Sequence, residues 1–287
     1  MSSSQRPMQH IDRKELYTNL EARIRYLHSF LDFSSKDIEA LTYGAKYIKA
    51  LIPAVVNILY KKLLQYDITA RAFQTRSTSY EGPMDSLPHE DSPQIHHRKL
   101  FLRAYLVKLC SDPRELEFWE YLDKVGMMHV GLGRTHPLHV EYVHIGAALA
   151  VIQDVLAEAI LSHPKMRLER KIGVVKALGK VIWIQNDLFA KWYVNDGEEF
   201  TDGVDYGGII EKEGWLHGKK VLREDRLDGE DAGEGEKEEV GGEKTPKRRQ
   251  SRDDDGESTT PTRMEGVCPF SGMSAATAGM SELKVAE

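Results

Sequence analysis

KVGMMHVGLG, residues 124–133, contains the histidine on which the interpretation of the whole chain depends. Apolar residues around it recur at Phe118, Leu122, Val125 and Leu132. Steps of four, seven and fourteen from the first of them place all four on one face of an α-helix. The position eleven residues after Phe118 lies on the same face and is His129, so an imidazole stands where the pattern predicts a leucine.

Helical spacing continues on both sides of this stretch. Ser34 and Asp37 have the spacing of a capping box, Pro53 can begin or kink a helix, and Asp112 is a candidate cap for the helix that carries His129. No stretch alternates with period two for long enough to make a convincing strand, so the body is predicted to be all-α. The expected helices cover 11–31, 34–52, 53–63, 95–109, 111–129, 137–161 and 166–194.

The composition divides the chain into a body, residues 11–200, and two flanking segments. Residues 1–10 are predicted to be disordered, and so is most of 201–287, since residues 224–263 contain no aromatic residue and cannot bury enough apolar surface. Residues 204–222 are intermediate and could pack on the body or form a docking element. An apolar island, 267–273, contains a Cys-Pro pair at Cys268 and suggests a short docking motif for a protein partner.

Charge and cysteine usage exclude several classes of protein. The net charge is −6 overall, +5 over residues 1–195 and −11 over residues 196–287, so no basic face predicts binding to nucleic acid. Two distant cysteines predict neither a disulfide framework nor a zinc site and suit a reducing cytoplasm. The polar N-terminus predicts no signal peptide, and no unbroken run of roughly 18 apolar residues predicts a membrane span.

A lone histidine on an apolar face is usually a core residue with one hydrogen bond. Three features favour a ligand instead. Gly126, one turn earlier, would leave the helix surface open to a flat group, and GLG at 131–133 ends the helix just after His129. The expected helices 137–161 and 166–194 are apolar enough to wall a pocket, with Trp183, Phe189 and Tyr193 on the second of them. A buried imidazole also needs a partner for its ring nitrogen. In an all-α domain, a haem iron is one such partner.

On these residues the sequence resembles the protoglobin and globin-coupled-sensor branch of the globins, over about residues 10–200. The resemblance rests on Gly126-Met-Met-His129, followed by Gly131-Leu132, Pro137 and Tyr142. It implies a globin fold with an extra N-terminal helix and a haem b whose iron is bound by His129. The loop at 75–93 is longer and richer in proline than this resemblance implies.

The resemblance also implies the remaining pocket residues. Tyr60 would be the distal hydrogen-bond donor to bound dioxygen, and Phe73 and Phe101 would be apolar walls that slow autoxidation. Gly126 and Tyr142 complete the expected cofactor-binding set. His96 or His97 could enter the distal pocket, and the alternative proximal ligands are His136, His139 and His144, of which the first two could also chelate zinc weakly.

Three functions are compatible with such a site. The first is reversible binding or sensing of O₂, CO or NO. The second is a haem enzyme, an NO dioxygenase or a peroxidase-like protein, that would need an external reductase. The third is a cofactor-free helical interaction protein in which His129 is a core residue. Residues 201–287 are too few for an output enzyme of ordinary size, so a sensor is expected to act through a protein partner of the tail.

Assembly and localisation are further expectations. The resemblance suggests a homodimer through the last two long helices, by isologous packing. The expected localisation is cytoplasmic, although KRRQSR at 247–252 could act as a nuclear-import patch or, at Ser251, as a kinase site.

Overall fold

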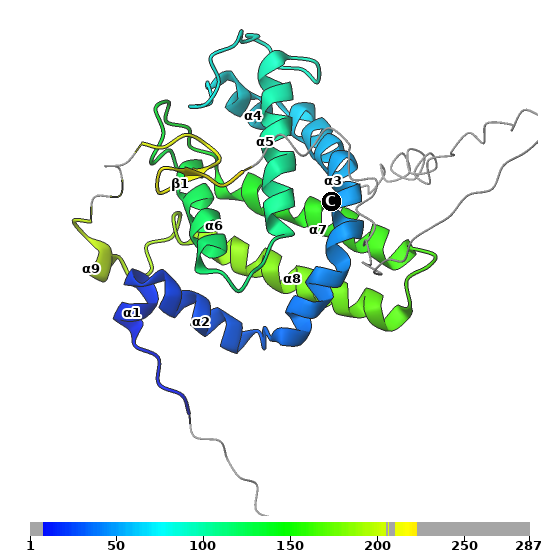
Figure 1. Cartoon of the computed structure of the whole chain (residues 1–287). Helices are drawn as coiled ribbons and strands as arrows, with labels where there is room; N and C mark the ends of the chain where they lie inside the picture. Colours follow the sequence, from blue (N-terminus) through cyan, green and yellow to red (C-terminus); the bar gives the residue numbers. More distant parts are fainter. Residues whose placement is uncertain (1–7, 205, 207–209, 223–287) are drawn as a thin grey trace, which may run out of the picture. The chain divides into compact units, whose positions relative to one another are not determined.

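The computed structural model describes residues 8–204, 206 and 210–222, and its regular structure is almost entirely α-helical (Figure 1). Residues 201–204, 206 and 210–222 are described within the expected tail, whereas Cys268, the 267–273 island and the 247–252 patch lie outside the described residues. The elements in chain order are α1 Arg13–Thr18, α2 Leu20–Phe30, α3 Ser35–Gln65, α4 Asp67–Ala70, the 3₁₀ helix η1 Arg71–Gln74, α5 Pro93–Leu109, α6 Leu116–His129, α7 Tyr142–Ser162, α8 Leu168–Ala190, α9 Glu198–Thr201, β1 Trp215–Leu216 and β2 Lys219–Lys220.

The expected extra N-terminal helix is divided into α1 and α2 at Asn19. The Asn19 side chain accepts a hydrogen bond from the Ala22 N–H and thereby caps α2. Arg23 on α2 then donates two hydrogen bonds, of 2.6 and 2.9 Å, to the Asp187 carboxylate on α8. This charge-assisted, bidentate pair fixes the N-terminal helices to the last long helix.

The capping box at the start of α3 is confirmed, because the Asp37 carboxylate accepts from the Ser34 N–H at 2.9 Å. The expected break at Pro53 is wrong: α3 is one helix that continues through this proline. Proline removes one backbone donor from a helix. Around it, Ile52, Val55 and Val56 are buried, and burial of that apolar face favours continuation of the helix.

Two helix starts differ from the prediction. Asp112 accepts from the Arg114 N–H in a separate turn, and α6 begins only at Leu116. Helix α7 begins at Tyr142 rather than at 137, because the preceding residues are extended and the Val140 N–H donates to the His129 carbonyl at 2.8 Å. This hydrogen bond keeps residues 137–141 from adopting the helical conformation.

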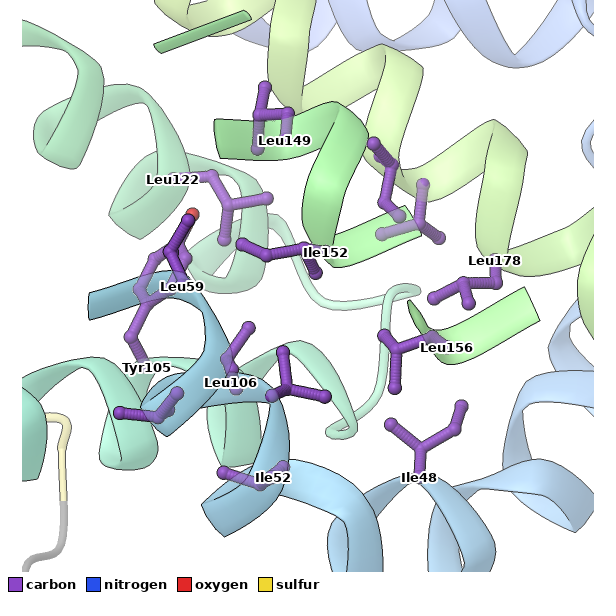
Figure 2. Close-up of a cluster of buried hydrophobic side chains, with 14 of the residues drawn as sticks. Ile48, Ile52, Leu59, Tyr105, Leu106, Leu122, Leu149, Ile152, Leu156 and Leu178 are labelled. Atoms are coloured by element: carbon purple, nitrogen blue, oxygen red, sulfur yellow. The ribbon is translucent and has the colours of Figure 1, made fainter. Parts of the chain in front are cut away.

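The core lies between α3, α5, α6, α7 and α8 (Figure 2). On α7, one face is buried, with apolar residues at intervals of three and four positions. The labelled cluster in Figure 2 consists of Ile48, Ile52, Leu59, Tyr105, Leu106, Leu122, Leu149, Ile152, Leu156 and Leu178. Burial of these side chains, at ~1.5–3 kcal/mol each, is the main stabilising contribution to the fold.

Some apolar side chains of α7 are exposed on the face opposite the core, which also carries Asp154 and Glu158. Val143 is 67% exposed, and α7 is by length and composition apolar enough to cross a membrane. A single helix of this kind is weak support for a membrane span, since core helices of soluble proteins share these properties. On α8, Ile172 and Trp183 are also exposed.

Residues 210–222 pack against the body, which is the first of the two alternatives that the sequence left open for this segment. Trp215–Leu216 and Lys219–Lys220 pair as a short antiparallel hairpin, and Leu216 and Leu222 are buried. Lys124 on α6 donates to the Glu211 carboxylate and to the Trp215 carbonyl. The ordered body therefore extends beyond the predicted boundary at residue 200.

Candidate functional site

A cavity of about 440 Å³ opens among the helices next to His129. This volume lies within the range that is typical of small-molecule and cofactor sites. Its walls are mainly apolar and come from α3, η1, α5, α6, α7 and α8, with Leu59, Val125, Ile145, Leu149 and Phe189 among them. The 210–222 segment adds Glu213 and Leu222.

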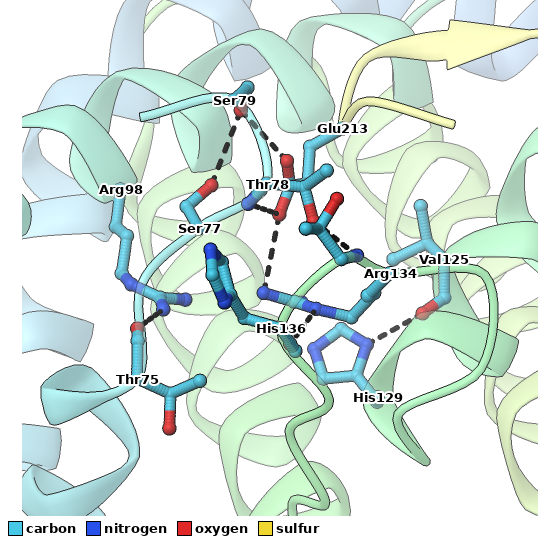
Figure 3. A network of polar contacts seen from close by, with 11 residues as sticks. Thr75, Ser77, Thr78, Ser79, Arg98, Val125, His129, Arg134, His136 and Glu213 are labelled. Atoms are coloured by element: carbon cyan, nitrogen blue, oxygen red, sulfur yellow. Dashed lines mark hydrogen bonds and ion pairs between the residues drawn. The ribbon is translucent and has the colours of Figure 1, made fainter. Parts of the chain in front are cut away.

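His129 is the last residue of α6, and its side chain lines the cavity. Its Nδ1 lies 2.7 Å from the Val125 carbonyl oxygen one turn earlier (Figure 3). A carbonyl oxygen can only accept, so Nδ1 carries the proton and Nε2 keeps its lone pair. Burial, reinforced by the charges of Arg134 and Arg98, lowers the pKa of His129 to about 4. The imidazole is therefore neutral near pH 7, as a metal ligand must be.

Tyr60 on α3 and Phe73 on η1 lie side by side in the same cavity. Their ring centroids are 5.5 Å apart and nearly parallel, with an interplanar angle of 28°. Burial raises the pKa of the Tyr60 phenol, so the hydroxyl stays protonated and can donate a hydrogen bond. The structure thus brings the predicted pair together with His129 on one cavity.

Phe101 on α5 also lines the cavity, as predicted. His97 lies between Tyr80 and Phe101, with ring centroids 4.7 and 4.9 Å away, and His96 is exposed. Neither histidine is part of the cavity wall. The geometry gives no support to a second histidine from α5 at the site.

Gly126 and Tyr142 lie beside the cavity rather than in its wall. The expectation that Gly126 leaves space for a flat group is wrong, since a Cβ there would lie 2.9 Å from Phe189 Cδ1 and 3.0 Å from the Leu188 oxygen. Glycine at this position instead allows α6 to approach α8 closely. Tyr142 donates to the Asn186 side-chain oxygen at 2.9 Å, which joins the start of α7 to α8.

The other candidate histidines differ in their surroundings. His139 and His144 line the cavity, whereas His136 contributes its carbonyl oxygen to Arg134. Within the described residues, no three His, Cys, Asp or Glu side chains come together as a metal site. A zinc site at these histidines therefore receives no support.

Two arginines in the cavity wall were missed at the sequence level. Arg98 donates to the Thr75 carbonyl at 2.6 Å, and its guanidinium lies 5.6 Å from the centroid of Phe73. Arg134 forms an ion pair with Glu213, with 3.2 Å between nitrogen and oxygen (Figure 3). The wall also contains Arg71 and Glu141, so its three arginines and two glutamates give it a net positive charge. From the sequence, Arg98 could have been placed beside the pocket because it lies three residues before Phe101, whereas no such spacing indicates Arg134.

Comparison with family models identifies the family of this chain. The protoglobin family model matches residues 20–199. Among solved structures, the globin domain of the Geobacter sulfurreducens globin-coupled sensor is similar at 17% identity with a TM-score of 0.43, covering 59% of this chain and 97% of that domain. No curated protein matches the chain. Because the family model spans well over half of the sequence, this chain belongs to the protoglobin family.

Proposed function

We propose that this protein binds haem b through His129 and reversibly binds a diatomic gas in the cavity. The observation that carries the proposal is the contact of His129 Nδ1 with the Val125 carbonyl in the cavity wall. The Val125 carbonyl holds the proton on Nδ1, and burial keeps the ring neutral, so Nε2 is available to the iron.

The donor set and the walls fit this cofactor. Haem needs one axial imidazole, apolar contact with both faces and cations for its carboxylates. His129 provides the first, the aliphatic and aromatic walls provide the second, and Arg98 provides a largely buried guanidinium. Arg98 remains charged although burial lowers its pKa, because arginine does not deprotonate in proteins.

When bound, haem supplies the iron that takes up O₂, CO or NO. The protein then supplies polarity, shape and exclusion of water. The Tyr60 hydroxyl is a donor for the polar end of a bound ligand, and one hydrogen bond of this kind contributes ~0.5–1.5 kcal/mol. Phe73 and Phe101 keep bulk water away from the site, which favours the ferrous state.

A gas sensor needs an output, and we assign this role to the tail. The C-terminal part of the chain is acidic and contains the 267–273 island, which suits a docked protein partner in the cytoplasm. The outer faces of α7 and α8 suit a homodimer. Their exposed apolar side chains, among them Val143, Ile172 and Trp183, form a surface of the kind that proteins usually bury against a partner.

Titration of the purified chain with haem, followed by absorption spectroscopy, tests the proposal. One haem per chain and a Soret band that shifts with CO after reduction are expected. Absence of a band beyond that of free haem would leave the helical interaction protein as the better account. Turnover of NO with an external reductase would instead identify an enzyme, whereas binding without turnover supports a gas binder or sensor.

A further inference from the structure

The 210–222 segment lies outside the matched family region, yet it is anchored on both sides of the cavity. One anchor is Glu213. Its carboxylate accepts from the Thr78 N–H at 3.0 Å and from the Ser79 hydroxyl at 2.8 Å, and it forms the ion pair with Arg134 (Figure 3). One side chain thus joins two separate segments of the body.

The groups that Glu213 joins belong to the two sides of the proposed haem site. Thr78 and Ser79 lie in the loop that follows Phe73. Arg134 lies in the turn that follows His129. A further hydrogen bond, from the Thr135 N–H to the Thr78 hydroxyl at 3.3 Å, connects the same loop and turn directly. The Glu213 carboxylate therefore links the loop after Phe73 to the turn after His129.

The remaining contacts of the segment hold Glu213 in place. The Glu211 carboxylate binds Lys124 on α6 and accepts from the Gly218 N–H at 2.7 Å. Leu222 is 1% exposed, and its side chain is part of the cavity wall. Gly214, with a φ of +84°, brings the backbone close to Phe101, where a Cβ would lie 3.3 Å from the ring. The segment is thus packed as part of the wall.

The Glu213–Arg134 pair is ionised and well enclosed. The side chains are 16% and 7% exposed, respectively. Burial alone would raise the pKa of Glu213, but its hydrogen bonds and the charge of Arg134 outweigh this effect and lower the pKa. Loss of the carboxylate would leave the Arg134 guanidinium buried without a counter-charge, which is more disruptive than loss of a surface pair.

We propose that residues 210–222 form an additional wall of the haem pocket, and that Glu213 is a positioning residue whose carboxylate controls how tightly haem is retained. This inference rests on the proposed haem site. It assigns a role in haem retention to a segment beyond residue 199, from which the acidic tail continues.

The experiment compares haem transfer to excess apomyoglobin from the full-length wild type and from Glu213→Ala, Glu213→Gln and Lys219→Gln. Lys219 is exposed in the same hairpin and serves as the matched control. Glu213→Ala should lose haem about tenfold faster than the control, as expected for loss of a charge-assisted contact. The isosteric Glu213→Gln should be intermediate and provides the test if the alanine variant does not fold.

Two further measurements separate local positioning from a general structural role. Hydrogen exchange in the haem-free chain should show faster exchange at the Thr78 amide in Glu213→Ala. Because Glu213→Gln also leaves Arg134 without its counter-charge, haem loss from every variant is measured under conditions in which unfolding measurements show the chain to be fully folded. Haem loss at the control rate in both Glu213 variants, or a rate that simply follows global unfolding, would overturn the inference. A wild type that binds no haem would refute the proposed function. Exchange at the Thr78 amide would still show whether Glu213 holds the loop in the haem-free chain.

Discussion

Alanine at Gly126 should loosen the contact between α6 and α8 one turn before His129. The added Cβ would lie 2.9 Å from Phe189 Cδ1, 3.0 Å from the Leu188 oxygen and 3.0 Å from the Phe189 Cα. The Phe189 ring can rotate away, but the two backbone atoms cannot. The helices must therefore separate by a few tenths of an ångström for the residue to fit.

The net effect follows from two opposing contributions. Overpacking of this kind costs ~1–3 kcal/mol, and replacing glycine by alanine inside a helix returns ~1 kcal/mol. At Gly173 on α8, a Cβ would meet only the Ala40 Cβ at 3.7 Å, an ordinary contact. Gly173→Ala should therefore stabilise the protein by ~0.5–1 kcal/mol. The two variants should differ by about 1–3 kcal/mol, with Gly126→Ala the less stable.

Urea unfolding of both full-length variants in the haem-free state, monitored by circular dichroism, measures this difference. The midpoint for Gly126→Ala should fall below that for Gly173→Ala at an unchanged slope. Equal stability of the two variants, or a more stable Gly126→Ala, would show that α6 and α8 are not in the close contact described.

Three further predictions concern the site and the assembly. Tyr60→Phe should speed O₂ release by about three- to tenfold in stopped-flow measurements and change CO release less, because O₂ is the more polar bound ligand; unchanged O₂ release would make Tyr60 a core residue only. Burial lowers the pKa of His129 in the folded chain to about 4. In the unfolded chain the same imidazole has its ordinary pKa of about 6.5, so it takes up a proton at a higher pH than in the folded chain. The stabilisation is present above about pH 6.5 and is lost as the pH falls towards about 4, so haem-free wild type should lose about 2 kcal/mol relative to His129→Gln between pH 6.5 and 5 in chemical unfolding; an equal loss in both proteins contradicts this. Trp183→Glu, at a position that is 61% exposed, should convert a dimer into a monomer in light scattering while Lys61→Glu does not, and a monomeric wild type would exclude the proposed interface.

Local patterns in the sequence predicted much of the helical body. The Ser34–Asp37 capping box and the apolar periodicity around His129 depend only on residues within one or two turns, so they can be recognised without a structure. The position of Tyr60 and Phe73 beside the same cavity as His129 was implied by the family resemblance and is reproduced by the geometry.

Features that depend on distant parts of the chain could not be predicted in this way. Residues 137–141 have helical spacing, but the Val140 N–H pairs with the His129 carbonyl and the segment is extended. Gly126 appeared to be an opening for a ligand, whereas the contact that requires glycine comes from α8, more than sixty residues later. The pair between Arg134 and Glu213 is separated by a similar distance in sequence, and no local pattern connects the two residues.

The most direct test of the central claim is the absorption spectrum of haem bound to His129→Gly, with and without added imidazole. His139→Gly is the matched control, since His139 also lines the cavity. If His129 is the iron ligand, the glycine variant should lose or displace the Soret band of the wild type, and imidazole should restore it, while His139→Gly keeps the wild-type spectrum. An unchanged Soret band and CO shift in His129→Gly would contradict the assignment of His129 to the iron.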